Sequence, residues 1–233
     1  MQFFDRSSEA SRPFLTWQRI IDWAHTHYRD RIFRKDERIP ARPGLLYLVN
    51  KGVIRLVGKN TQLNSINDTI ADSVDDSELN EDFPEETFLG FVPPGQPFEI
   101  VTQSCYDLHA YCHLDGTQVI WLYWHDLDNW PHFRQEVYEA LRYQHQRKLL
   151  WLSALGQRKT IDRLMSFLTL LVEEYGESCE TGYCLPYVLT HAQIGSSIGS
   201  TRVTVTRLMG KLRRRGLIII RDDNSICIPD MGQ

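Results

Sequence analysis

Two arginines frame a stretch whose side chains suit the reading of nucleic-acid bases. The stretch GSTRVTVTRL covers residues 199–208, with arginine at positions 202 and 207. An arginine can donate two hydrogen bonds to guanine O6 and N7, and the methyl groups of Val203 and Thr206 can pack on the C5 methyl of thymine. This chemistry requires Arg202, Val203, Thr206 and Arg207 to share one exposed face.

The local residue types in this stretch favour two different structures. The alternation VTVT is typical of a strand, but Val205, Leu208 and Leu212 follow the spacing of one helical face. The alternation stops at Arg207 while the helical period continues. The sequence therefore predicts a helix that buries these three apolar residues.

A shorter helix is predicted just before it. Thr190 and the glutamine three residues later form a capping box, which indicates a helix over residues 191–198. Gly199 would end this helix, and Ser200 or Thr201 would cap the next one. Two helices joined by a tight turn containing glycine form a helix-turn-helix.

The remaining elements of this region extend the predicted interface. The segments GLIII and ICI, on either side of RDDNS, predict a hairpin, or wing. Basic residues late in the second helix, Lys211 among them, suit contacts with phosphates. The predicted DNA-contacting set is Thr190, His191, Ser200, Thr201, Arg202, Val203, Thr206, Arg207 and Lys211.

Composition and charge limit the class of protein. Apolar residues make up 42% and charged residues 24% of 233, as in a soluble globular protein. There is no apolar leader or membrane-length run, so a cytoplasmic protein with no membrane partner is expected. Residues 60–133 hold 14 acidic and no Lys or Arg residues, whereas residues 134–233 hold 14 basic and 10 acidic ones. The chain as a whole is therefore not suited to a polyanion, but its last third could be.

The sequence of the N-terminal part predicts short strands on either side of a polar insertion. Residues 31–59 and 87–125 break into short apolar runs with Pro and Gly turns, which favours a β-roll. Residues 60–86 between them are acidic and lack a period, so we expect a solvated insertion. The alternative is an acidic surface that repels DNA or engages a protein partner.

Residues 131–153 predict a long helix with one narrow apolar seam, as in a coiled coil. The seam that we favour for a homodimer is Tyr138, Leu141, His145, Leu149 and Leu152. A more polar competing seam is Val137, Leu141, Gln144, Lys148 and Trp151. A helix that packs only on its own chain is the remaining alternative.

No metal, cofactor or catalytic site is predicted. The five cysteines are odd in number and lack C-x-x-C spacing, so ordinary reduced thiols are expected. His109 and His113 could be metal ligands of a cupin-like enzyme, but that alternative lacks the H-x-H pattern and leaves the C-terminal helices unexplained.

The turn at Asn50-Lys51-Gly52, the β-roll, the long helix and the stretch LTHAQIGSSIGSTRVTVTRLMGKLRRRGLI together resemble the Crp/Fnr transcription regulators. GSTRVTVTRL is most similar to their cyanobacterial nitrogen-control type. The resemblance implies a homodimer on a palindromic promoter site, with Arg202 and Arg207 as base readers and Thr190 at a phosphate. RNA polymerase is a further candidate partner.

The chain departs from the cyclic-nucleotide members of this family. The stretch after Pro94-Gly95 lacks their glycine and arginine, and no Arg or Lys lies between Asn60 and Phe133. A buried phosphate without a cationic partner is costly, so cAMP dependence is not expected. The residues identify no other effector.

The predicted fold class is α+β, with a β-roll of the cyclic-nucleotide-binding type, a dimerisation helix and a C-terminal winged helix-turn-helix. The corresponding domains are 1–130, 131–153 and 154–233. The predicted function is sequence-specific DNA binding by a transcription regulator that is not an enzyme. The alternatives are the cupin-like enzyme and a regulator that acts mainly through protein contacts.

Overall fold

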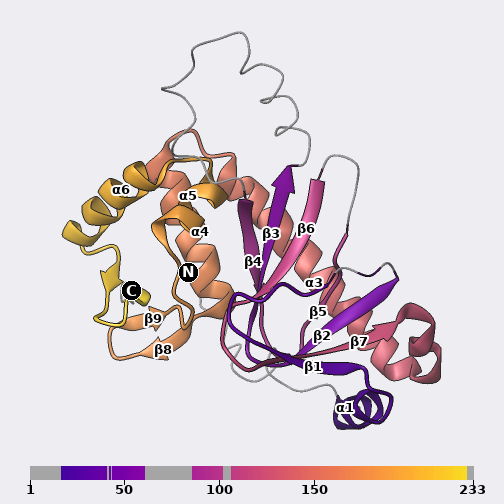
Figure 1. Ribbon diagram of the computed structural model, residues 1–233. Coiled ribbons are helices and arrows are strands. Elements are labelled where there is room, and N and C mark those ends of the chain that lie inside the picture. The colour runs from indigo at the N-terminus through magenta and orange to yellow at the C-terminus, as the bar shows by residue number, and fades with distance from the viewer. Residues whose placement is uncertain (1–16, 41, 43, 61–85, 102–105, 230–233) are drawn as a thin grey trace, which may run out of the picture. The chain divides into compact units, whose positions relative to one another are not determined.

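The computed structural model (Figure 1) describes residues 17–40, 42, 44–60, 86–101 and 106–229. In chain order, the elements are α1 (Trp17–Thr26), β1 (Asp30–Phe33), β2 (Leu45–Lys51), β3 (Ile54–Asn60), β4 (Glu86–Val92), β5 (Pro97–Phe98), β6 (Tyr106–Cys112), β7 (Thr117–Tyr123), the 3₁₀ helix η1 (Trp124–Asn129), α3 (Pro131–Leu155), α4 (Thr160–Tyr175), β8 (Glu177–Cys179), β9 (Gly182–Cys184), α5 (His191–Ile198), α6 (Arg202–Arg214), β10 (Ile219–Ile220) and β11 (Ile226–Pro229). Residues 61–85 of the predicted acidic insertion, and Cys105, lie outside the described residues.

The chain divides into two compact units, and the boundary falls inside α3, between His145 and Gln146. Each unit has its own buried apolar residues. The three-part division at 1–130, 131–153 and 154–233 stays a prediction. None of the described helices is both long enough and apolar enough to cross a membrane.

The first unit is a roll of two antiparallel sheets with strand orders β1-β7-β2-β5 and β4-β3-β6. Strand β2 is buried on both faces. Its residues Leu45, Tyr47 and Val49 pack in the cluster that contains both sheets, whereas Leu46 and Leu48 pack with α1 and the start of α3. Burial on both faces explains why LLYLV is a continuous apolar run instead of an alternating one.

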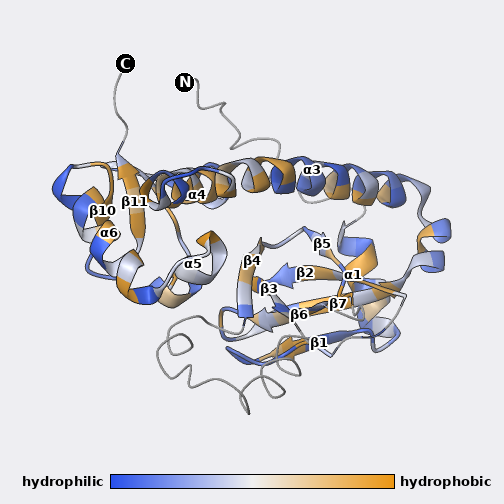
Figure 2. Cartoon of the chain, turned by 90° about the horizontal axis from the view of Figure 1, so that it is seen from above, coloured by the Kyte–Doolittle hydropathy of each residue, from blue (hydrophilic) through white to orange (hydrophobic). Residues whose placement is uncertain are grey.

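The second unit packs the C-terminal half of α3 and three shorter helices with the sheet β10-β11-β9-β8. Helix α4 supplies the largest share of the buried residues in this unit, including Phe167. The Trp151 ring of α3 lies edge-on to the Phe167 ring, with 5.3 Å between the two ring centroids. Helix α5 contacts both α4 and α6, and α4 also contacts β11. Hydrophilic and hydrophobic residues mix along α3, whereas β11 is largely apolar (Figure 2).

The predicted fold class is confirmed: a mixed α+β fold with a β-rich N-terminal unit, a long helix, and a helix-turn-helix followed by a wing. The long helix predicted at 131–153 is observed as Pro131–Leu155. Proline is well placed at a first helical position, because its missing N–H would have no partner within the helix there.

Candidate nucleic-acid interface

The first helix of the pair begins with the predicted capping box. The Gln193 N–H donates to Thr190 Oγ1 at 3.1 Å, and the Thr190 N–H donates to Gln193 Oε1 at 2.9 Å. Helix α5 ends at Gly199, which adopts the left-handed conformation with φ 61°. Glycine has no Cβ penalty there, so the chain can turn directly into α6.

The turn between α5 and α6 is tight because Gly195 has no side chain. A Cβ on Gly195 would lie 2.7 Å from the Ser200 carbonyl oxygen, and the Ser200 N–H donates to the Gly195 carbonyl at 2.9 Å. This packing leaves Ser200 only 8% exposed. Ser200 is therefore a buried turn residue, which corrects its place in the predicted DNA-contacting surface.

Of the two predicted caps for α6, the structure uses Thr201. Its Oγ1 accepts a hydrogen bond from the Thr204 N–H at 3.2 Å. The buried face of α6 consists of Val205, Met209 and Leu212, and Leu208 is only half-buried. The sequence predicted Leu208 on this buried face, but its neighbour Met209 takes that place. The two residues are adjacent and both apolar, so the helical period alone does not distinguish them.

The opposite face of α6 carries the predicted base-reading side chains. Arg202, Val203, Thr206 and Arg207 are all exposed, Val203 to 64%, and Lys211 follows one turn later. Residues three and four positions apart are neighbours on a helix surface. Arg202 and Thr206, Val203 and Arg207, and Arg207 and Lys211 are each four apart, and Val203 and Thr206 are three apart, so these side chains form one surface. We call Arg202, Val203, Thr206, Arg207 and Lys211 the α6 face.

Gly210, which sequence reasoning missed, and Arg214, which it placed among the basic residues that suit phosphates, also belong to this surface. They lie seven and eleven residues after Val203, which returns them to nearly its angle around the helix. A Cβ on Gly210 would contact only Arg214 Nη1, at 3.9 Å. The helical period of the surrounding residues was the signal that could have found Gly210.

Thr206 is held in place by two hydrogen bonds. Its hydroxyl donates to the Arg202 carbonyl at 2.9 Å, and Oγ1 lies 2.8 Å from His191 Nδ1. A hydroxyl whose proton is already donated must accept the second bond, so the neutral His191 ring carries its proton on Nδ1. Burial, and next the charge of Arg202, lower the pKa of His191 below its usual value. His191 thus supports the α6 face at Thr206, a residue that is exposed.

Local electrostatics favour a polyanion at this surface. Residues 181–221 contain seven Lys or Arg and no Asp or Glu. Three of these cations, Lys211, Arg213 and Arg214, lie in the last turn of α6, where the helix dipole favours positive charge. The α6 face therefore presents uncompensated cations near polar and methyl groups.

The predicted wing is present, and its tip has the opposite charge. Strands β10 and β11 pair antiparallel, and the turn closes by hydrogen bonds between Arg221 and Ser225 and between Asn224 and Arg221. Asp222 and Asp223 are exposed in this turn. Hydrogen bonds from Ser225 hold the pKa of Asp223 below its usual value, so the carboxylate stays charged.

The seam that we favoured on α3 is exposed in the single chain. Tyr138 is 51%, Leu149 53% and Leu152 65% exposed, and His145 is also exposed. Leu141 differs, because it is half-buried and packs with the core of the first unit. In the competing seam Val137 and Trp151 are buried, so that seam packs within the chain.

Arg163 of α4 joins two segments of the second unit. Its guanidinium donates to the carbonyls of Gln157 and Ile198, both at 3.1 Å, and to Thr160 Oγ1 at 3.2 Å. Gln157 lies between α3 and α4, and Ile198 is the last residue of α5. One side chain therefore links the end of α3 to the turn that precedes α6.

The expectation of reduced thiols is wrong for two of the five cysteines. Cys184 and Cys227 form a disulfide, although they are 43 residues apart. They occupy paired positions on β9 and β11, and only strand pairing reveals this proximity. His109 and His113 are buried beside aromatic rings and belong to no group of three potential metal ligands within the described residues.

Comparisons with known proteins match the helix-turn-helix region. Residues 162–233 match the family model of the Crp-like helix-turn-helix domain. The chain is 42% identical to the global nitrogen regulator of a Nostoc species over 71 residues. The aligned region covers 30% of this chain and 32% of that protein. The chain is 36% identical over 91 residues to the regulatory protein CysR of Synechococcus elongatus, 38% of this chain and 42% of that one. The match to the first relative thus spans about a third of that protein's length.

Solved structures resemble nearly the whole chain in fold. A CooA mutant from Carboxydothermus hydrogenoformans has a TM-score of 0.66 at 17% identity, over 95% of this chain and 93% of its own. A protein from Listeria monocytogenes that contains a cyclic nucleotide-binding domain has a TM-score of 0.67 at 12% identity, over 93% of this chain and 99% of its own. Residues 162–233 therefore form a helix-turn-helix domain of the Crp-like family, and the likeness to the solved structures shows the fold of the rest of the chain.

Proposed function

We propose that this protein is a homodimeric transcription regulator that binds a palindromic DNA site through the α6 face, without cAMP. The observation that carries the proposal is the α6 face itself. It places two arginines, two methyl-bearing side chains and a lysine together on the exposed side of a capped helix. No acidic residue lies within residues 181–221 to neutralise them.

The side chains have different parts in this proposal. Arg202 and Arg207 donate to guanine edges, and Val203 packs against a thymine methyl group. Thr206 contributes its methyl group, because its hydroxyl is occupied by Arg202 and His191. Thr190, at the start of α5, and Lys211 contact phosphates. Thr201 positions α6 by capping it.

The exposed seam on α3 supports a homodimer. Tyr138, Leu149 and Leu152 are large apolar side chains, each more than half exposed on one side of a long helix. Burying such side chains against a second copy removes their apolar surface from water. A two-fold dimer presents two α6 faces to two half-sites, which we expect about 34 Å apart, one helical turn of DNA.

Three of the cations that could neutralise a cyclic phosphate, Arg55, Arg134 and Arg147, have other partners. Arg55 donates to Asp36 at 2.5 Å, and its guanidinium lies over the Tyr111 ring. Arg134 bonds to Asp128 at 2.6 Å. Arg147 is 6% exposed and bonds to the Leu170 carbonyl and to Glu174. These contacts support the proposal that DNA binding does not depend on cAMP.

Selection of bound sequences from a random DNA pool tests the proposal, with wild-type protein and Val203→Glu run in parallel. Wild type should recover an inverted repeat. A carboxylate at position 203 accepts a hydrogen bond from cytosine N4 but cannot pack on a methyl group, so one base pair in each half-site should change from A·T to C·G. Lys211→Ala is the matched control, because a lost phosphate contact should leave the motif unchanged. Recovery of no motif by wild type would refute sequence-specific binding.

A further inference from the structure

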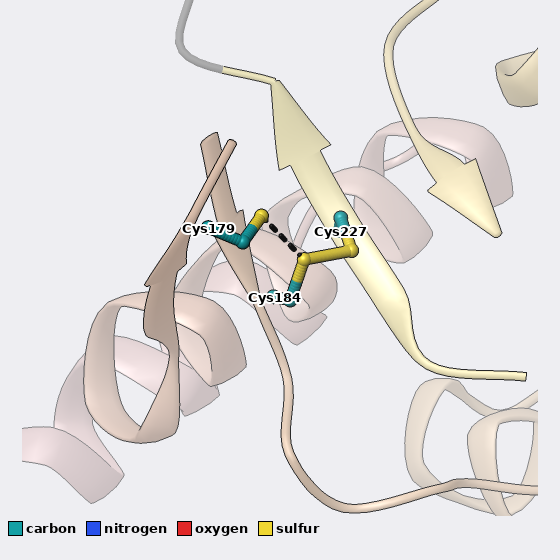
Figure 3. A group of neighbouring side chains, drawn as sticks. All are labelled: Cys179, Cys184 and Cys227. Atoms are coloured by element: carbon teal, nitrogen blue, oxygen red, sulfur yellow. Dashed lines mark hydrogen bonds between the residues drawn. A yellow bond between two sulfur atoms is a disulfide. The ribbon is translucent and has the colours of Figure 1, made fainter. Parts of the chain in front are cut away.

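Three cysteines meet in the sheet that carries the wing, and each comes from a different strand (Figure 3). Cys184 on β9 and Cys227 on β11 form the disulfide. The sulfur of Cys179, on β8, lies 2.7 Å from the sulfur of Cys184. A free thiol therefore lies directly beside one end of a disulfide.

The surroundings of Cys179 suit a nucleophile. Its sulfur lies 3.4 Å from the Thr181 hydroxyl oxygen, and hydrogen bonding by Thr181 is the main cause that lowers the pKa of this thiol. The guanidinium of Arg221 acts in the same direction, and its Nη1 is 4.0 Å from the Cys184 sulfur. The thiolate is the reactive form of cysteine.

The other sulfurs are less accessible. Cys184 is 6% and Cys227 0% exposed, whereas Cys179 is half-buried. Cys112, in the first unit, is fully buried, and burial raises the pKa of its thiol to about 12. Of the four cysteines within the described residues, Cys179 alone combines accessibility with an activated thiol.

We propose that Cys179, Cys184 and Cys227 form a thiol–disulfide exchange site. The Cys179 thiolate attacks the Cys184 sulfur, the new Cys179–Cys184 bond forms as the Cys184–Cys227 bond breaks, and Cys227 leaves as a thiolate that takes up a proton. The proton lost from Cys179 balances the one gained by Cys227, so the exchange needs no oxidant or reductant. A dithiol reductant that supplies two electrons converts either linkage into three thiols.

The two linkages differ in what they hold together. The Cys184–Cys227 disulfide links β9 covalently to β11, the wing strand that also pairs with β10. The Cys179–Cys184 disulfide would link β8 to β9, which is already its hairpin partner. The wing would then have no covalent link to β9. Disulfides in intracellular proteins are usually transient or redox-sensing, so this step of the argument rests on the proposed function of the chain as a DNA-binding regulator.

The same three sulfurs lie within 4.8 Å of one another and could in principle hold a soft metal ion. Two observations favour exchange. Two of the sulfurs are already bonded to each other, and no His, Asp or Glu of the described chain joins the group as a fourth ligand.

The test is disulfide mapping by differential alkylation and mass spectrometry of the full-length protein in glutathione redox buffers. Wild type should contain both the 184–227 and the 179–184 linkages. Cys227→Ser should form the 179–184 disulfide, and Cys179→Ser should hold only 184–227. Cys112→Ser is the control and should match wild type. Circular dichroism establishes that each variant is folded.

Two results would overturn the proposal. One is Cys227→Ser protein that is folded but keeps both Cys179 and Cys184 reduced under conditions that oxidise wild type. The other is native protein whose three thiols are all reduced and hold a stoichiometric metal by elemental analysis. Neither readout uses DNA, so a failed exchange site and a failed DNA-binding proposal are distinguishable.

Discussion

Helices α3 and α6 each expose a stripe of side chains that the folded chain leaves uncovered, and the two stripes differ in chemistry. On α3 the stripe is apolar and includes Tyr138, Leu149 and Leu152. On α6 it is cationic and includes Arg202 and Arg207. Apolar surface is stabilised by burial against another apolar surface, whereas uncompensated cations are stabilised by an anion. This difference supports the proposal that a second copy of the chain covers the stripe on α3 and that DNA binds the stripe on α6.

The largest effect should come from placing charge in the α3 stripe. Leu149→Glu combined with Leu152→Glu removes four leucines from the dimer interface and buries like charges there, so dimer affinity should fall by at least about 1000-fold, or about 4 kcal/mol. Sedimentation velocity measures this directly. Leu150→Glu is the matched control, since Leu150 is 50% exposed but lies about 100° around the helix from Leu149. A double variant that remains dimeric would refute the assignment of α3.

A smaller effect should come from the α6 stripe, and it should leave the dimer intact. Arg202→Ala should weaken binding to the selected site by about 1–3 kcal/mol and relax base preference at one position of each half-site. Lys211→Ala should weaken binding to all sequences alike. Fluorescence anisotropy with selected and scrambled duplexes separates these outcomes. Equal losses on both duplexes for Arg202→Ala would mean that Arg202 contacts only phosphates.

The wing tip sharpens the comparison because its two exposed acids, Asp222 and Asp223, follow the cationic helix in the chain by only a few residues. Asp222→Asn combined with Asp223→Asn should raise DNA affinity by about two- to fivefold at low salt, and the gain should shrink as salt screens the charges. Asparagine keeps an oxygen that can accept the Ser225 N–H bond made by Asp223, so the turn should survive. An unchanged affinity across all salt concentrations would place the wing tip away from the DNA.

The smallest effect concerns the support of the α6 stripe by His191. Its pKa is lower in the folded protein than the usual 6.5, so the unfolded chain binds more protons between the two pKa values. The free energy of unfolding should therefore fall as the pH is lowered through 6.5 toward the folded-state pKa. His191→Gln should flatten this part of the profile in urea titrations at several pH values. An identical profile for wild type and variant would show that His191 is not the responsible group.

The helix-turn-helix was predictable because its signals are local. The capping box of Thr190, the turn at Gly199 and the apolar period of α6 each depend on residues fewer than eight positions apart. The choice of Met209 over Leu208 for the buried face was not predictable, because both are apolar and adjacent, and only the packing of the folded chain distinguishes them. Ser200 and Thr201 are likewise equivalent as caps in the sequence. The close packing of Gly195 against Ser200 buries Ser200, and Thr201 is the cap.

The parts that the sequence did not reveal depend on distant pairing. Nothing in the spacing of Cys184 and Cys227 predicts that β9 and β11 pair in register. The two seams on α3 were also open alternatives, since both have helical spacing. The cores of the two units distinguish them by covering Val137 and Trp151 and leaving Leu149 and Leu152 uncovered.

The guanidinium of Arg163 has a mechanical consequence. The guanidinium donates hydrogen bonds to the Gln157 and Ile198 carbonyls at the same time. The segment after α3 and the end of α5 therefore cannot move apart without breaking a charge-assisted hydrogen bond. Ile198 directly precedes the Gly199 turn, so the Arg163 side chain connects the segment after α3 to the turn from which α6 starts. A displacement of the segment after α3 would therefore strain a hydrogen bond that holds the start of the turn before α6.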